Sequence, residues 1–198
     1  MNLKEERIGN YIWRMFYDDC GFNPREDSNL TKMVCFHKRY NLGDDHDLKS
    51  DDFDSWDEME KYITSMEDPL IIKPLYLYDH SGITIRTRPF GDRWDSGQVG
   101  FVYVRKQDVR DNFFIKRCGQ RITERVDVLL EGEVEMYDKY LTGEVYGYEI
   151  SKVVVDEDGD EHEKGLERCG GYFDEDQCEH DCRVNLEWFM NNEQVVVV

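Results

Sequence analysis

Two short polar segments carry residue types that could do acid–base or nucleophilic chemistry. Asp79-His80-Ser81-Gly82 holds the three residue types of a serine hydrolase relay. Adjacent residues of an extended chain point to opposite faces, so these three cannot form that relay among themselves. The segment therefore indicates a polar turn in which Asp79 and Ser81 bond backbone amides. Acid–base chemistry by His80 with a distant carboxylate such as Asp95 stays open as the alternative.

The second segment is Trp94-Asp95-Ser96-Gly97. Its Asp and Ser are suited to bonding local amides, its Gly tolerates unusual dihedral angles, and Trp94 is expected to pin the loop to the core. A binding surface built on the same loop is the alternative interpretation.

Cysteines near the C-terminus are the candidate metal ligands. Cys169, Cys178, His180 and Cys182 could supply three thiolates and an imidazole to zinc. No Cys-x2-Cys pair exists, and on a helix Cys178 and Cys182 would share a face while His180 points away. The N-terminal sequence also lacks the apolar segment of a signal peptide, which favours a reducing compartment. We therefore expect free thiols and no cofactor, with zinc as the alternative.

The run Asp156-Glu157-Asp158-Gly159-Asp160 resembles a calcium loop only in composition. An EF-hand needs Gly at its sixth position, and here Gly159 is fourth. The run is therefore expected to be a hairpin turn.

Charge is concentrated in two places. The chain has 198 residues and a formal charge of -19, of which residues 44–60 carry -8 and residues 156–181 carry -10. Segments with this much negative charge repel nucleic-acid phosphates and anionic lipids and attract basic proteins. A conventional DNA or RNA binder is the class most nearly excluded, and no apolar run is long enough to cross a bilayer. We expect a soluble protein whose partner presents a basic surface.

Carboxylates are also the expected partner-binding residues. One group lies in the second acidic segment: Asp156, Glu157, Asp158, Asp160, Glu161, Asp174, Glu175, Asp176, Glu179 and Asp181. The other recurs every three or four residues along a predicted helix: Glu124, Asp127, Glu131, Glu135 and Asp138. This stripe is interpreted as a solvated helix face, or alternatively as an imitation of nucleic-acid phosphates.

The helices and strands that the sequence pattern predicts around these residues indicate an α+β fold. We expect one domain over residues 1–198, with a central, mainly antiparallel sheet packed by a long amphipathic helix over 120–141 and by smaller helices. Expected helices cover 5–17, 105–113 and 185–190, and another begins near Ser55, where Ser55-x-x-Glu58 is a capping box. Expected extended segments cover 33–40, 71–78, 83–87 and 98–104, and a hairpin joins 144–155 to a strand after 161. A loop rich in Gly, acids and Cys follows, and residues 195–198 form an edge strand or a frayed end.

Three segments resemble a family of accessory proteins encoded by tailed phages and prophages. They are FYDDCGFNPREDSNLTKMVCFHKRYNLGD, PLYLYDHSGITIRTRPFGDRWDSGQVGFVYV and EVEMYDKYLTGEVYGYEI. The resemblance spans most of the chain, except the stretch from Cys169, and PLYLYDHSG followed by WDSGQVGFVYV is its most specific part. It implies a phage accessory protein acting in the cytoplasm of the bacterial host, and it implies no mechanism.

These observations lead to three functional hypotheses. The first is a non-enzymatic counter-defence protein whose acidic surface mimics nucleic acid and inhibits a host nuclease complex, either CRISPR or restriction–modification. The second is a small hydrolase centred on the 79–82 and 94–97 loops. The third is a regulatory adaptor that binds a basic protein.

Overall fold

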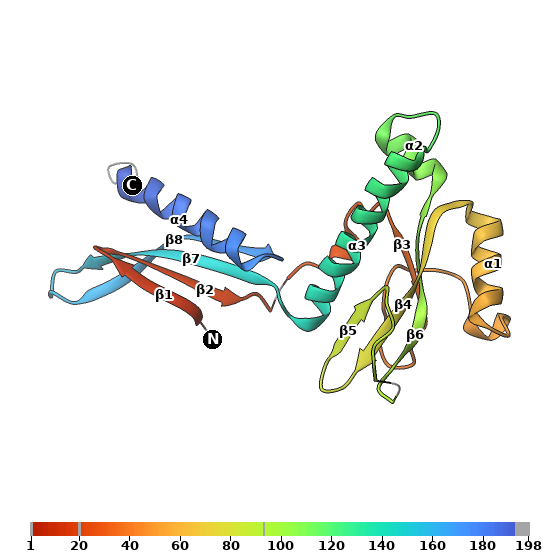
Figure 1. Ribbon diagram of the computed structural model, residues 1–198. Coiled ribbons are helices and arrows are strands. Elements are labelled where there is room, and N and C mark those ends of the chain that lie inside the picture. The colour runs from red at the N-terminus through yellow and green to blue at the C-terminus, as the bar shows by residue number, and fades with distance from the viewer. Residues whose placement is uncertain (1, 20, 93, 193–198) are drawn as a thin grey trace. The chain divides into compact units, whose positions relative to one another are not determined.

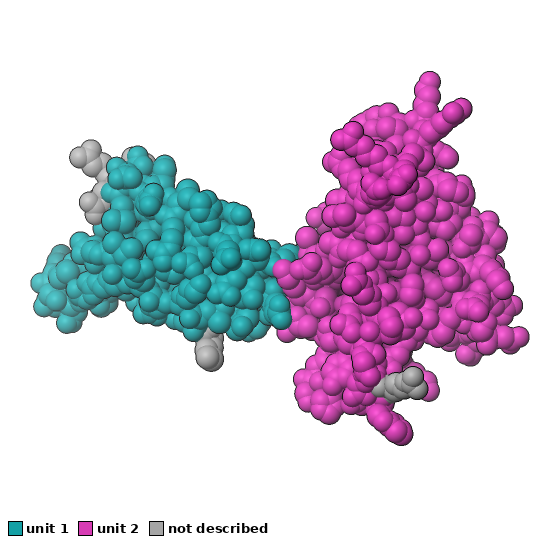
Figure 2. All heavy atoms as spheres, viewed as in Figure 1, with its two compact units in different colours: residues 1–22, 143–198 teal, residues 23–142 magenta. Residues whose placement is uncertain are grey.

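The computed structural model describes residues 2–19, 21–92 and 94–192, which fold into two compact units (Figures 1 and 2). Unit 1 comprises residues 1–22 and 143–198, and unit 2 comprises residues 23–142. This division differs from the single domain that the sequence led us to expect. No linker composition marks the boundary between the units. Unit 1 combines the two ends of the chain, and unit 2 is the sequence segment between them.

Unit 1 is an antiparallel sheet covered on one face by a helix. Its strands are β1 (Asn2–Ile8), β2 (Tyr11–Tyr17), β7 (Tyr146–Val155) and β8 (Glu161–Tyr172), in the order β1-β2-β7-β8. The helix α4 (Glu175–Asn191) packs on this sheet (Figure 1). Trp13 and Met15 of β2 are buried together with Cys178, Cys182 and Leu186 of α4.

The two termini of unit 1 correct two of our predictions. The helix expected over 5–17 is wrong: Gly9 adopts a φ of 62°, and β1 and β2 form a hairpin around it. Tyr11, Trp13 and Met15 alternate toward the core with period two, a pattern that partly coincides with helical spacing. The helix expected over 185–190 is present but longer: α4 begins directly after its N-cap residue Asp174, where a loop was expected.

Unit 2 is a second four-stranded antiparallel sheet with helices on both faces. Its strands are β3 (Lys32–Cys35), β4 (Pro69–Asp79), β5 (Ile83–Arg86) and β6 (Ser96–Arg105), in the order β3-β6-β4-β5. Its helices are α1 (Trp56–Glu67), α2 (Lys106–Phe113), α3 (Gln120–Thr142) and the short 3-10 turns η1 (Pro24–Glu26) and η2 (Ser50–Asp52).

Two apolar faces hold unit 2 together (Figure 1). On one side of the sheet, Val126, Leu130 and Val134 of α3 are buried against strand residues that include Leu75 and Val102. On the other side, Met59 and Ile63 of α1 pack against β3 and β6. The α+β class and the antiparallel pairing are confirmed, although two sheets replace the one we expected.

Several local predictions for unit 2 and for the last hairpin are also confirmed. Ser55 caps α1, its hydroxyl accepting a hydrogen bond from the Glu58 amide at 3.2 Å. The strands over 71–78, 83–87 and 98–104, the helices over 105–113 and 120–141 and the hairpin after 144 are all present within a few residues. Residues 195–198, for which an edge strand or a frayed end was expected, lie outside the described residues.

A buried polar network anchors the loop that precedes the acidic segment 44–60. The Arg25 guanidinium, with 2% of its side chain exposed, forms two parallel bonds to the Asp44 carboxylate at 2.8 and 2.7 Å. Glu133 of α3 accepts bonds from the Leu30 and Thr31 amides and from the Thr31 hydroxyl. These contacts fix where β3 begins and where the chain leaves it. Among the described residues, no helix has the length and apolar character of a membrane span.

Candidate functional site

The two polar loops singled out in the sequence lie together at one end of unit 2. Pairing of β4 with β6 places Asp79 beside Asp95, and the Asp79 amide donates to the Asp95 carbonyl at 2.8 Å. His80 Nδ1 lies 3.0 Å from Asp95 Oδ2. The His80–Asp95 pair, which the sequence offered only as an alternative, is therefore present.

A third segment, the loop after β3, joins this cluster. Arg39 forms an ion pair with Asp79, and His37 Nε2 lies 3.9 Å from Asp79 Oδ2. The backbone N–H groups of Arg39 and Tyr40 both point at His37 Nδ1, at 3.3 Å. Nδ1 is thus the acceptor, which leaves the ring proton on Nε2. Sequence reasoning missed these residues; the run His37-Lys38-Arg39 between two aromatic residues, Phe36 and Tyr40, was the available signal.

This arrangement can do acid–base chemistry but offers no activated nucleophile among the described residues. The 3.0 Å separation of His80 Nδ1 and Asp95 Oδ2 is the imidazole–carboxylate pairing that general acid–base catalysis uses. Ser96 Oγ donates to the Asp92 carbonyl instead of facing a base. Burial raises the pKa of the Cys35 thiol to about 12, so that group stays protonated.

A shallow pocket of about 360 Å³ connects the loops, with His37, Arg39, Asp79, Trp94 and Asp95 among its lining residues. Trp94 is 96% exposed, so the prediction that it pins the loop to the core is wrong. His80 itself is 63% exposed.

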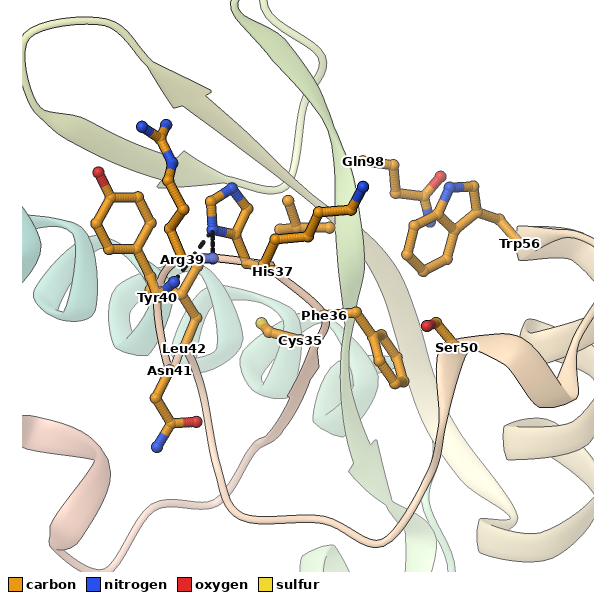
Figure 3. A pocket seen from close by; sticks show the side chains of 12 residues that line it. Cys35, Phe36, His37, Arg39, Tyr40, Asn41, Leu42, Ser50, Trp56 and Gln98 are labelled. Atoms are coloured by element: carbon orange, nitrogen blue, oxygen red, sulfur yellow. Dashed lines mark hydrogen bonds between the residues drawn. The ribbon is translucent and has the colours of Figure 1, made fainter.

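A larger pocket of about 770 Å³ adjoins the first and shares His37, Arg39 and Val99 with it (Figure 3). The loop after β3 forms much of its wall. The wall is completed by Ser50, the first residue of η2, by Trp56, the first residue of α1, and by Gln98 of β6.

The first acidic segment, residues 44–60, divides into one structural carboxylate and a group of exposed ones. Asp44 belongs to the buried network with Arg25. The others are exposed and form no ion pair with any residue that the structure describes. We call them the unpaired acids: Asp45, Asp47, Asp51, Asp52, Asp54, Asp57, Glu58 and Glu60.

Three of the unpaired acids surround an apolar hollow. Asp47, Asp52 and Glu58 line a pocket of about 420 Å³ together with Phe53 and Tyr62. The two rings meet edge to face, with centroids 5.3 Å apart. Carboxylates beside aromatic faces are the surroundings that a lysine or arginine side chain prefers.

Most carboxylates of the second acidic segment have partners within unit 1. Lys4 pairs with Glu175 and Glu179, at 3.0 and 2.6 Å, and Arg7 pairs with Glu161 at 3.0 Å. Hydrogen bonds from Lys4 lower the pKa of Glu179, and those from Arg7 lower the pKa of Glu161. These side chains therefore serve the fold of unit 1 before any partner binds.

The turn between β7 and β8 carries a group of exposed carboxylates that form no ion pair with any described residue. Asp156 accepts hydrogen bonds from the Asp160 amide, from His162 and from the Asp158 amide, which lower its pKa. Gly159, with a φ of 87°, closes the turn, which confirms the hairpin interpretation. Among the described residues, Glu157, Asp158 and Asp160 are exposed and form no ion pair. On α4, Asp174 caps the helix and Asp181 accepts from the Gln177 amide, while Asp176 is exposed.

The carboxylate stripe of α3 is neither a freely solvated face nor a row of free charges. Asp127 and Glu131 pair with Lys73 of β4, and Glu131 also accepts from the Thr87 hydroxyl. Asp138 accepts from the Thr84 hydroxyl and the Ile85 amide, both at 2.7 Å. Glu135 pairs with Lys139, and Glu124 accepts from Gln120. Asp127, Glu131 and Asp138 thus attach α3 to the sheet, whereas Glu124 and Glu135 are exposed and have partners only within α3.

The fold brings Cys169, Cys178 and Cys182 of the candidate zinc site into one apolar cluster of unit 1. Cys178 and Cys182 are fully buried on the sheet-facing side of α4, whereas His180 is exposed. Burial raises the pKa of each of these two thiols to about 12. Cys169 lies on β8. In the described part of the chain, no group of three or more His, Cys, Asp or Glu side chains could hold a metal ion.

No family model matches this chain, and neither a curated protein nor a solved structure matches it.

Proposed function

We propose that the protein is a non-enzymatic inhibitor that docks acidic surfaces onto the basic, nucleic-acid-binding surface of another protein. The observation that carries this proposal is the group of eight unpaired acids in segment 45–60. Elsewhere in unit 2 several carboxylates are paired, as Asp127 and Glu131 are with Lys73. Within segment 45–60, repulsion between like charges costs stability, and no described cation lies within ion-pair distance of these carboxylates.

Folding explains only some of these acids. Asp57 and Glu58 lie in the first turn of α1, where the helix dipole favours negative charge. Glu58 also accepts from the Asp54 amide at 2.8 Å. Asp45, Asp47, Asp51 and Asp52 have no comparable role in the fold. A cationic partner is a physical reason for keeping them.

The hollow between Phe53 and Tyr62 gives such a partner a point of attachment. A lysine or arginine side chain entering it would meet two ring faces and the carboxylates of Asp47, Asp52 and Glu58. Arginine is enriched at the centres of protein interfaces, where such contacts contribute most of the affinity. Glu157, Asp158 and Asp160 on unit 1 supply a second, separate acidic patch.

A nuclease complex of a bacterial host is the class of partner that best fits this chemistry. Its nucleic-acid channel is basic, and the resemblance to tailed-phage accessory proteins supplies a setting in which blocking it would be useful. On this proposal the protein acts in the host cytoplasm, binds no nucleic acid through these surfaces and needs no cofactor. A regulatory adaptor for another basic protein would use the same surfaces.

Matched charge variants test the proposal. One variant neutralises three unpaired acids: Asp45→Asn, Asp47→Asn and Asp52→Asn. A second neutralises the hairpin turn with Glu157→Gln, Asp158→Asn and Asp160→Asn. A control makes the same change in net charge at exposed positions outside both patches: Glu26→Gln, Asp111→Asn and Glu144→Gln.

The readout is phage plating on cells with an active restriction or CRISPR system, followed by DNA cleavage with the purified complex. We expect the wild type and the control to protect the phage, and at least one patch variant to lose tenfold or more of that protection. Excess DNA should compete with the protein for the complex. No protection in either system, or patch variants equal to the control, would overturn the proposal.

A second candidate, a small hydrolase, is favoured by one observation: the two polar loops share a pocket that also holds His37 and Arg39. His80, oriented by Asp95, would take a proton from an attacking water, and Arg39 would neutralise charge on the substrate. Hydrolysis of carboxylic or phosphoric esters that is lost in His80→Gln and kept in His180→Gln would support it. Equal rates in those two variants would exclude His80 chemistry.

A further inference from the structure

We infer that the 770 Å³ pocket of unit 2 binds a nucleotide, that is, a flat heterocyclic base joined through a sugar to phosphate. This inference does not rest on the unpaired acids, although two lining residues of the pocket, Ser50 and Trp56, belong to segment 44–60. The volume falls within the range of about 300–1,000 Å³ that is typical of small-molecule sites. The lining divides into aromatic faces, amide and hydroxyl groups, and cations, which are the three kinds of group a nucleotide requires.

Aromatic faces form one part of the wall. Phe36 and Trp56 have ring centroids 6.3 Å apart, and both side chains are partly exposed. Other rings support them: Trp56 rests edge to face on the buried Phe101, and Phe36 lies 4.9 Å from the His46 ring. Rings held in this way offer a rigid stacking surface. Stacking one base on an aromatic side chain is worth about 1–3 kcal/mol.

Polar groups beside the rings match the edge of a base. Figure 3 shows the Gln98 amide beside the Trp56 indole, with Phe36 and Ser50 on the same side of the pocket. Gln98 donates through Nε2 to the Gly100 carbonyl at 3.3 Å, which leaves its carbonyl oxygen to accept a hydrogen bond from a ligand. Asn41 contributes a second amide, with donor and acceptor capacity.

The charged groups that line the pocket favour an anion. They are the bases Lys38 and Arg39, of which Arg39 also pairs with Asp79 of the adjoining pocket, and His37, which lines both pockets; no carboxylate lines this cavity. Lys38 is exposed and forms no ion pair with any described residue. His37 keeps its proton on Nε2 because Nδ1 accepts from two backbone amides, so even the neutral ring remains a donor. In a chain of net charge -19, a cavity with only basic ionisable groups points to a phosphate.

The full chain titrated with AMP, GMP, CMP and UMP tests this inference, with binding followed by calorimetry. Further arms use adenosine, inorganic phosphate and a trinucleotide. We expect at least one mononucleotide to saturate the site and to bind tenfold or more tighter than both its nucleoside and inorganic phosphate. Tighter binding of the trinucleotide would support the same chemistry, with a strand end as the source of the nucleotide.

Two lysine variants provide the comparison. Lys38→Gln should weaken nucleotide binding tenfold or more, whereas Lys61→Gln, an exposed lysine of α1 outside this pocket, should leave it unchanged. Hydrogen exchange should show protection by the nucleotide in residues 36–42. No saturation at millimolar nucleotide, equal binding by both variants, or phosphate binding as tight as that of the nucleotide would overturn the inference.

Discussion

Asp44 provides the sharpest test of the distinction between structural and docking carboxylates, because its neighbour Asp45 is an exposed residue of the same acidic segment. Asp44 pairs with Arg25, whose side chain is 2% exposed, and also accepts from the Met33 amide at 2.8 Å. Asp44→Ala would leave the guanidinium buried with Thr31 and, at 3.5 Å, Glu133 as its remaining partners.

The structure sets the expected magnitude. Removing one partner of a buried ion pair costs about 3–5 kcal/mol, and Glu133 offsets part of that cost, so we expect a loss of about 3 kcal/mol in the free energy of unfolding of unit 2. Asp45→Ala should change it by less than about 0.5 kcal/mol. A double variant, Arg25→Met with Asp44→Leu, should recover part of the loss because it leaves no buried charge.

Urea denaturation with amide hydrogen exchange measures these differences unit by unit. With a slope of about 1–3 kcal/mol per molar urea, the midpoint of unit 2 should fall by about 1–3 M in Asp44→Ala. Exchange should accelerate in β3 and α3 and stay unchanged in β7 and α4. A loss below about 1 kcal/mol, or equal effects of Asp44→Ala and Asp45→Ala, would refute the assignment of Asp44 to the fold.

Three further predictions follow from other contacts. A Cβ at Gly100 would lie 1.9 Å from the Val34 carbonyl oxygen, whereas one at Gly97 meets nothing within 4 Å; Gly100→Ala should therefore destabilise unit 2 by about 1–3 kcal/mol in urea denaturation and Gly97→Ala much less. Burial raises the pKa values of Cys178 and Cys182 to about 12, so at pH 8 mass spectrometry should find both thiols alkylated only after unfolding; rapid native labelling would contradict their burial. Hydrogen bonds from Arg14 lower the pKa values of Glu5 and Glu163 below their ordinary 4.5, so this stabilisation is present above that pH and is lost as the pH falls through the lowered values. Unit 1 should accordingly lose stability from about pH 4.5 downward, and Arg14→Gln should flatten the acid limb of its stability curve.

Local rules in the sequence predicted much of unit 2. The capping box at Ser55, the strand composition of β4 and β6 and the apolar stripe of α3 each specify an element without reference to the rest of the chain. The hairpin β1–β2 was mistaken for a helix because Ile8 and Ile12 lie four residues apart on adjacent strands. Only pairing with β7, more than 130 residues away, decides between the two patterns.

The candidate sites depended on contacts that a sequence does not display. His80 and Asp95 meet because β4 and β6 are neighbours in the sheet, and Arg39 reaches Asp79 across 40 residues. The acidic segments looked alike in composition, yet Lys4 and Arg7 neutralise much of one, and no described cation pairs with segment 45–60. Whether a carboxylate is free depends on the distant strand that carries its cation.

The most direct test of the central claim is capture of host proteins by the tagged full-length chain at low and high salt, with the Asp45/Asp47/Asp52→Asn variant and its charge-matched control alongside. We predict that the wild type and the control retain a nuclease complex at low salt, that added DNA or high salt releases it, and that the variant fails to retain it. Retention that is indifferent to salt and DNA, or equal capture by the variant, would contradict the proposal that the acidic surface occupies a nucleic-acid-binding site.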